Sequence, residues 1–255
     1  MRTRSLTRMH KTGPVHRRPI DNNAAVAASK ENNMGIKRLN ESTICAFGDS
    51  TTWGDNGCGG GGNDISWTSH LGALLGGATV ENFGIKGSRI AVKADRNDSF
   101  VERLDGIDDT ADIYVVFGGV NDFSRNVPLG EPDSTDVHEF YGALDYLIRT
   151  IAARSPQARL VFMTPCKTSG KHEKDIPATN EANLLGLTQD AYVRAMLEVC
   201  DRYSVPVIDL YAQSGISPFL PEHRELYMPD GLHYSPAGYE RLAHRIAAGL
   251  TAVCR

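Results

Sequence analysis

Short apolar runs alternate with amphipathic stretches along most of this chain, and this order constrains its fold more than any other feature. Five runs have the length and composition of strands, at residues 43–47, 79–83, 113–117, 159–163 and 205–210. Apolar residues at helical spacing occupy residues 67–75, 136–154 and 188–203, and the segment that follows Pro236. Strands that alternate with helices form parallel sheets covered on both faces. We therefore predict an α/β domain with a five-stranded parallel sheet.

Length and composition favour one ordinary globular domain and exclude several other classes. A chain of 255 residues with 41% hydrophobic and 23% charged residues can bury a single α/β core. The formal net charge of −4 gives no reason to expect a nucleic-acid partner. Five scattered cysteines lack the spacing of a disulfide framework or a metal site, and Cys166 has no adjacent histidine that would favour a thiol nucleophile.

The N-terminal segment differs from the rest of the chain. Six basic residues precede the first acid, Asp21, and the apolar residues there show no period. We predict a flexible basic tail at residues 1–40 and a folded domain at residues 41–255. The segment lacks the apolar core of a secretory signal, and no stretch of the chain is long and apolar enough for a membrane span. A soluble cytoplasmic protein is expected.

A serine follows the first predicted strand, and its chemical partners lie near the other end of the chain. The strand at 43–47 ends in Gly48-Asp49-Ser50, a triplet that alone is more typical of a turn. A serine hydroxyl becomes nucleophilic only beside a base, and that base needs a group that fixes its tautomer. Asp230 and His233 supply both from one loop, which leads into a helix capped by Ser235. We predict a Ser50–His233–Asp230 triad.

Acyl transfer also needs donors for the negative charge that develops on the carbonyl oxygen. Three are expected at the carboxyl ends of the strands: the backbone N–H of Ser50, the backbone N–H of Gly84 and the side-chain amide of Asn121. Gly84 follows the second strand and fits a plain turn equally well. Asn121 follows the central strand and is also a common turn former.

Two loops are long or unusual enough to need an interpretation. The glycine-rich run at 57–62 lacks the lysine of a phosphate-binding loop, so we interpret it as a flexible surface loop. The polar segment at 165–189 is too long for a passive connection and is expected to form a lid or wall of the site. Its charges alternate in sign, which is typical of a solvated surface.

These sequence blocks together resemble those of the SGNH hydrolases, also called GDSL esterases/lipases. The resemblance spans residues 41–255 and is carried by Gly48-Asp49-Ser50, Gly84, Gly119-Val120-Asn121-Asp122 and Asp230-Gly231-Leu232-His233. It implies a flavodoxin-like, three-layer α/β/α fold with Ser50 as nucleophile, His233 as general base and acid, and Asp230 as its orienter. It also implies that Gly84 and Asn121 complete the oxyanion hole. The letters GDSL in the family's shorter name stand for Gly-Asp-Ser-Leu, and this chain has Thr51 in place of the leucine.

The expected function is hydrolysis of carboxylic esters through an acyl-enzyme, without a metal or organic cofactor. Short acyl chains or O-acetyl groups are favoured, because the segment at 165–189 has no long apolar stretch. The substrate is a small-molecule or carbohydrate ester; Trp53, Trp67 and Tyr227 are candidates for stacking on a sugar ring and equally for packing in the core. An acyltransferase and a non-catalytic carbohydrate-binding module are the alternatives. The sequence does not indicate an oligomeric state.

Overall fold

The structure is a computed structural model that describes residues 37–171 and 174–254. The predicted tail therefore lies outside the described residues, except for residues 37–40. These four residues belong to the folded domain: the Lys37 ammonium pairs with the Asp112 carboxylate at 2.9 Å, and the Lys37 carbonyl accepts a bond from the Arg159 guanidinium at 3.0 Å. The domain thus starts before the boundary that we predicted at residue 41.

Within the described residues, five parallel strands form one sheet in the order β2-β1-β3-β4-β5. Their bounds are Thr43–Gly48 (β1), Thr79–Gly84 (β2), Ile113–Phe117 (β3), Arg159–Met163 (β4) and Val207–Ile208 (β5). This is the flavodoxin-like order, and it confirms the predicted sheet. The order reverses direction between β1 and β3, so the connections that leave these two strands diverge. A crevice is expected beyond their carboxyl ends.

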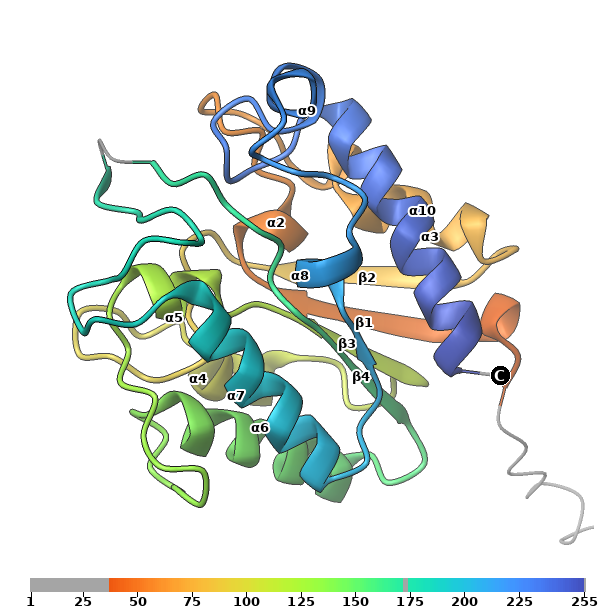
Figure 1. Ribbon diagram of the computed structural model, residues 1–255. Helices are drawn as coiled ribbons and strands as arrows, with labels where there is room; N and C mark the ends of the chain where they lie inside the picture. The colour runs from red at the N-terminus through yellow and green to blue at the C-terminus, as the bar shows by residue number, and fades with distance from the viewer. Residues whose placement is uncertain (1–36, 172–173, 255) are drawn as a thin grey trace, which may run out of the picture. The chain divides into compact units, whose positions relative to one another are not determined.

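Helices cover both faces of the sheet and complete three layers (Figure 1). Helices α3 (Trp67–Leu74) and α10 (Pro236–Val253) pack on one face, and α4 (Phe100–Arg103), α6 (Phe140–Arg154) and α7 (Gln189–Arg202) pack on the other. Side chains of β3 alternate between the two cores, and all five are buried. The uninterrupted apolar sequence of β3 follows from this double burial.

Shorter elements connect these layers. They are η1 (Leu39–Glu41), α2 (Ser50–Trp53), η2 (Asn63–Ile65), η3 (Leu104–Gly106), α5 (Val120–Ser124), α8 (Leu210–Gln213) and α9 (Pro221–Tyr227). Even the longest helix of the described residues lacks the apolar length that a bilayer-spanning helix needs.

Two predicted elements are shorter in the structure than in the sequence pattern. Strand β5 covers only Val207–Ile208, because Pro206 has no N–H for a ladder and Leu210 already begins α8. Helix α6 begins at Phe140 and not at residue 136. The Asp136 carboxylate bonds the His138 N–H and the Glu139 carboxylate accepts from the Ser134 hydroxyl, so this pair folds the preceding turn and does not cap the helix.

A partly buried arginine ties together the carboxyl ends of β1 and β2. The Arg103 guanidinium donates to the carbonyl oxygens of Gly48 and Phe83 at 2.9 Å each, and to the Ser88 hydroxyl at 2.9 Å. It lies over the rings of Phe47 and Phe100, and burial lowers its pKa to about 10. The Gly48 carbonyl also accepts the Ile85 N–H at 3.1 Å, so the guanidinium adds a charged donor at the edge of the sheet where the chain turns.

Substitution of Arg103 with methionine is expected to lower the free energy of unfolding by about 2–4 kcal/mol, because buried carbonyls lose a charged donor. Urea denaturation of the purified protein measures this change. The matched control is Arg194→Gln on α7, where the side chain is 71% exposed and pairs with Asp190. This control should change stability by about 0.5 kcal/mol or less. Equal stability of Arg103→Met and wild type would contradict the role given to this guanidinium.

Candidate active site

Three side chains from opposite ends of the domain meet at the carboxyl edge of the sheet. The Ser50 hydroxyl oxygen lies 3.0 Å from Nε2 of His233, and Nδ1 of the same ring lies 2.8 Å from Oδ2 of Asp230. The structure thus brings together the three residues that we predicted as a triad. Ser50 is buried, and the cavity described below reaches it from the surface.

Local bonds fix each member of this group. Ser50 is the first residue of α2, whose N-terminus is capped by the Asp49 carboxylate through the Thr51 N–H at 2.9 Å. Burial raises the pKa of Asp49 although Thr51 donates to it. The other oxygen of Asp230, Oδ1, accepts the backbone N–H groups of Leu232 and His233 at 3.0 and 2.7 Å. This turn holds the imidazole and its carboxylate on the same side of the loop.

Asp230 has a second charged partner. The Lys171 ammonium lies 2.9 Å from Oδ2 of Asp230, the same oxygen that contacts His233. Burial acts to raise the pKa of Asp230, but the bonds from His233 and Lys171 outweigh it and hold this pKa well below its usual range. Gly57 packs directly against the carboxylate: a Cβ at Gly57 would lie 2.5 Å from Asp230 Cγ. The start of the glycine-rich run therefore packs against Asp230, while Cys58, Gly59 and Gly61 are exposed, as expected for a surface loop.

Asn121 and Gly84, the other two expected donors, differ in their hydrogen bonds and in their position relative to the cavity. The Asn121 amide nitrogen donates to the Ser88 carbonyl at 3.0 Å and makes a longer bond of 3.3 Å to Asp49, and this side chain lines the cavity beside Ser50. The Gly84 N–H donates to the Asn82 side chain at 2.9 Å. A Cβ at Gly84 would lie 2.1 Å from the Trp53 backbone nitrogen. Gly84 thus allows β2 and α2 to approach closely, and its N–H is already engaged.

A second glycine in this turn, Gly87, faces the cavity. It lines the cavity together with Ser50 and Asn121, and its backbone has a φ of 75°, which favours glycine. Neither the Gly87 N–H nor the Ser50 N–H has a hydrogen-bond partner among the described residues. The Gly84 N–H, which we expected to donate to a substrate, is therefore engaged within the protein, whereas the Gly87 N–H borders the cavity.

The buried carboxylate of Asp122 holds the turn that faces Asn121. It accepts the N–H groups of Ile90 and Ala91 at 2.9 and 3.0 Å. Burial raises the pKa of Asp122 to about 6, although these two bonds lower it. Because Ser88 lies just before these residues, the same contact fixes the carbonyl that receives the Asn121 amide.

A cavity of about 360 Å³ opens beside Ser50 and His233. Its walls come from the α2 loop, the turn after β2, the end of α5 and the segment at 165–189. The described residues that line it are Ser50, Asp55, Gly57, Gly59, Lys86, Gly87, Arg96, Asn121, Arg125, Lys171, Lys174, Ile176, Leu232 and His233. The segment at 165–189 thus forms one wall. In the described chain, no group of three or more His, Cys, Asp or Glu side chains is placed to hold a metal ion.

Comparison with known proteins identifies the family of this chain. The model of the GDSL-like lipase/acylhydrolase family matches residues 46–241. The chain belongs to the GDSL-like lipase/acylhydrolase family. It is accordingly an ester hydrolase, and the resemblance noted in the sequence is confirmed. A search of the curated proteins finds no match.

Solved structures share the fold of this GDSL-like hydrolase over nearly their whole length. One crystal structure is 91% identical, covers 86% of this chain and 100% of its own, and superposes with a TM-score of 0.85. A protein from Lactobacillus plantarum is 29% identical, with coverage of 84% and 98% and a TM-score of 0.74. A lipase/acylhydrolase from Enterococcus faecalis is 24% identical, with coverage of 83% and 96% and a TM-score of 0.58.

Sequence reasoning missed two charged residues of this hydrolase site. We assigned Lys171 to a solvated surface, yet its side chain is only 10% exposed because it reaches Asp230. Asp55 lies 3.9 Å from Nε2 of His233 and pairs with Lys86 at 2.9 Å. Burial acts to raise the Asp55 pKa, but the Gly57 N–H and Lys86 lower it overall. The contacts of Lys171 with Asp230 and of Asp55 with His233 have no local sequence signal, because the two residues of each contact come from loops that are distant in the sequence.

Three other candidates from the sequence are engaged in contacts within the protein. Trp67 is fully buried against Phe117, so it packs in the core and does not reach a substrate. The ring of Trp53 is covered by the Lys86 ammonium at 4.0 Å from its centre. Burial raises the pKa of the Cys166 thiol to about 12, which keeps it protonated and excludes it as a nucleophile at neutral pH.

The depressed pKa of Asp230 predicts a pH-dependent contribution to stability. Below about pH 5, the carboxyl in the unfolded chain binds protons around its ordinary pKa of 3.8, while in the folded chain it stays ionised. Stability contributed by Asp230 is therefore present above that pKa and is lost as pH falls towards the folded value. Urea midpoints measured from pH 6 to pH 3 should fall more steeply for wild type than for Asp230→Asn. The exposed-site control Asp201→Asn should keep the wild-type slope; a parallel slope for Asp230→Asn would contradict the assignment.

Proposed function

We propose that this hydrolase cleaves short-chain carboxylic esters through a Ser50–His233–Asp230 triad and an acyl-enzyme intermediate. The observation that carries the proposal is the continuous contact from Ser50 Oγ to His233 Nε2 and from His233 Nδ1 to Asp230, at 3.0 and 2.8 Å. Both distances are within reach for proton transfer. A serine triad and an oxyanion hole are features of the family, which supports the same roles.

In the first half-reaction, the neutral imidazole keeps its proton on Nδ1, where it donates to Asp230, and Nε2 accepts the proton of Ser50. The hydroxyl oxygen then attacks the ester carbonyl carbon. As the alcohol leaves, the imidazolium returns the proton to it. Asp230 fixes the ring and stabilises its positive charge, while Lys171 and two backbone N–H groups hold that carboxylate in place.

Negative charge on the carbonyl oxygen meets donors that are already in position. The N–H groups of Ser50 and Gly87 have no partner among the described residues and flank the same cavity. Asn121 supplies the third donor: its bond to Ser88 is retained, and its longer bond to Asp49 is exchanged for the oxyanion. Each preorganised donor of this kind contributes about 3 kcal/mol to transition-state stability.

In the second half-reaction, water replaces the alcohol. His233 removes a proton from the water as it attacks the acyl-serine, and the ring then returns the proton to Ser50 as the acid leaves. The polar, open character of the cavity favours water as the acceptor. Hydrolysis releases the free carboxylic acid, whereas acyl transfer to another alcohol gives a new ester, so release of the acid distinguishes the two reactions.

The lining of the cavity favours a short acyl group. Among the described residues that form it, only Ile176 and Leu232 have aliphatic side chains; the rest are charged, polar or glycine. A growing acyl chain gains about 0.8 kcal/mol per methylene only where it finds apolar surface. This cavity offers little apolar surface to an acyl chain of more than a few carbons.

Ser50→Ala is expected to reduce ester hydrolysis by about a thousandfold or more, because the nucleophile is removed. Free acid released from 4-nitrophenyl acetate measures the reaction, and urea denaturation verifies that the variant folds. A fluorophosphonate should label wild type at Ser50, identified by peptide mass spectrometry, and should leave Ser50→Ala unlabelled. Ser69→Ala, a surface serine on α3, is the matched control. Retained activity in folded Ser50→Ala would overturn the assignment.

A series of 4-nitrophenyl esters tests the acyl preference. We expect kcat/KM to fall by about tenfold or more between the butyrate and the decanoate, because the longer chain finds little apolar wall in the cavity beside Ser50. Concentrations below the critical micelle concentration of each ester keep the comparison to dissolved substrate. A value of kcat/KM that rises steadily with chain length would contradict a short-chain specificity.

A further inference from the structure

The cavity that contains Ser50 and His233 is lined by an excess of cationic side chains. Five of them reach it: Lys86, Arg96, Arg125, Lys171 and Lys174. Among its described lining residues, the only carboxylate is that of Asp55. The chain as a whole has a formal net charge of −4, so this concentration of positive charge does not follow from composition.

Three of these cations are each balanced by one carboxylate. Lys86 pairs with Asp55 at 2.9 Å, and Lys171 pairs with Asp230 at 2.9 Å. The Arg96 Nε donates to Asp98 at 2.8 Å. Their charges are locally compensated, and these pairs hold the loops around the cavity in place.

Arg125 and Lys174 differ from these three. Among the described residues, neither forms an ion pair with a carboxylate, and the Lys174 ammonium makes no hydrogen bond. Arg125 donates through Nη1 to the Lys174 backbone carbonyl at 3.1 Å, which places both residues on the same wall. Both are exposed to solvent. Two uncompensated cations therefore face the space in front of the nucleophile.

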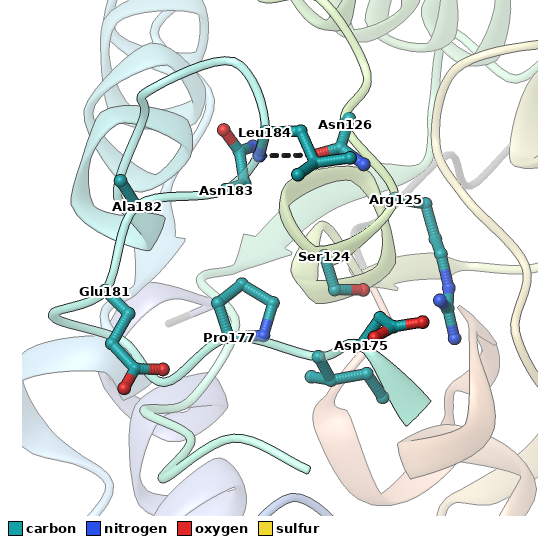
Figure 2. A pocket seen from close by; sticks show the side chains of 10 residues that line it. Ser124, Arg125, Asn126, Asp175, Pro177, Glu181, Ala182, Asn183 and Leu184 are labelled. Atoms are coloured by element: carbon teal, nitrogen blue, oxygen red, sulfur yellow. Dashed lines mark hydrogen bonds between the residues drawn. The ribbon is translucent and has the colours of Figure 1, made fainter. Parts of the chain in front are cut away.

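A second cavity continues from this wall. It has a volume of about 630 Å³ and lies between the end of α5 and the segment at 175–184 (Figure 2). Arg125 and Ile176 line both cavities, so they stand at the junction. The dashed bond in Figure 2, from the Leu184 N–H to the Asn126 side chain at 2.7 Å, fixes the far side of the second cavity. A substrate larger than a simple acetate ester can thus extend past Arg125.

We propose that the substrate carries an anionic group, a carboxylate or a phosphate, which Arg125 and Lys174 bind while Ser50 attacks the neighbouring ester. This inference rests on the proposed esterase function and adds the substrate class to it. A guanidinium binds such groups through parallel N–H donors, and a lysine adds a flexible point charge. Asp55 does not oppose this binding, because Lys86 already neutralises it.

The experiment compares neutral and anionic esters of matched reactivity. Mono-4-nitrophenyl succinate carries a carboxylate on the acyl side and is compared with 4-nitrophenyl acetate. On the alcohol side, 4-acetoxybenzoate and 4-acetoxyphenyl phosphate are compared with phenyl acetate. Each kcat/KM is divided by the rate of hydroxide-catalysed hydrolysis of the same ester, and the anionic-to-neutral ratio is the measured quantity. The two sides of the ester and the two kinds of anion are thereby separated.

Wild type should prefer at least one anionic ester by about tenfold or more, and 0.5 M NaCl should reduce this preference. In the double variant Arg125→Gln/Lys174→Gln, the ratio should fall by about fivefold or more. The control Arg149→Gln/Arg194→Gln removes two exposed cations from α6 and α7, outside the cavity, and should keep the wild-type ratio.

Two results would overturn the inference while leaving the esterase function intact. One is a wild-type ratio near one for every anionic ester, alongside normal hydrolysis of the neutral esters. The other is a preference that persists in the Arg125→Gln/Lys174→Gln variant. If wild type releases acid from none of these esters, the proposed function fails, and the assignment of an anionic substrate fails with it.

Discussion

The catalytic edge of this protein depends on how the chain leaves two neighbouring parallel strands. Arg103 provides the main constraint, because one guanidinium satisfies the last carbonyl of β1, a carbonyl near the end of β2 and the hydroxyl of Ser88. The two chain segments that leave these strands carry Ser50 and Gly87. Parallel sheets place their ligand sites where connections diverge, and here that divergence occurs between β1 and β3. One partly buried cation therefore holds together the two segments that carry Ser50 and Gly87.

Charge in the site is arranged in pairs that restrict motion. The Asp230 carboxylate accepts hydrogen bonds from His233, Lys171 and two backbone N–H groups, so it has little freedom to rotate away from the imidazole. Lys86 and Asp55 form a second pair on the other side of His233. Such pairs stabilise the fold modestly when they are near the surface. Their larger effect is to leave Arg125 and Lys174 as the cations with charge available to a substrate.

The sequence predicted those parts of the structure that have local or periodic signals. Strand β3 was predicted at its observed bounds, because burial on both faces requires an unbroken apolar run. The meeting of Ser50 and His233 followed from chemistry, since each residue needs the other. The sequence pointed to Gly84 because a glycine ends the second strand there, and only the bond from the Gly84 N–H to the Asn82 side chain shows that this N–H is engaged. Lys171 and Asp55 acquire their roles through contacts between distant loops, which no local pattern encodes.

The separation of Ser50 and His233 along the chain has a consequence for how the protein is made. Their contact joins residues 183 positions apart, and β1 lies inside the sheet between strands that are synthesised later. A ribosome therefore releases His233 only after almost all of the domain has been translated. The contact between Ser50 and His233 is in this way delayed until synthesis of the domain is nearly complete.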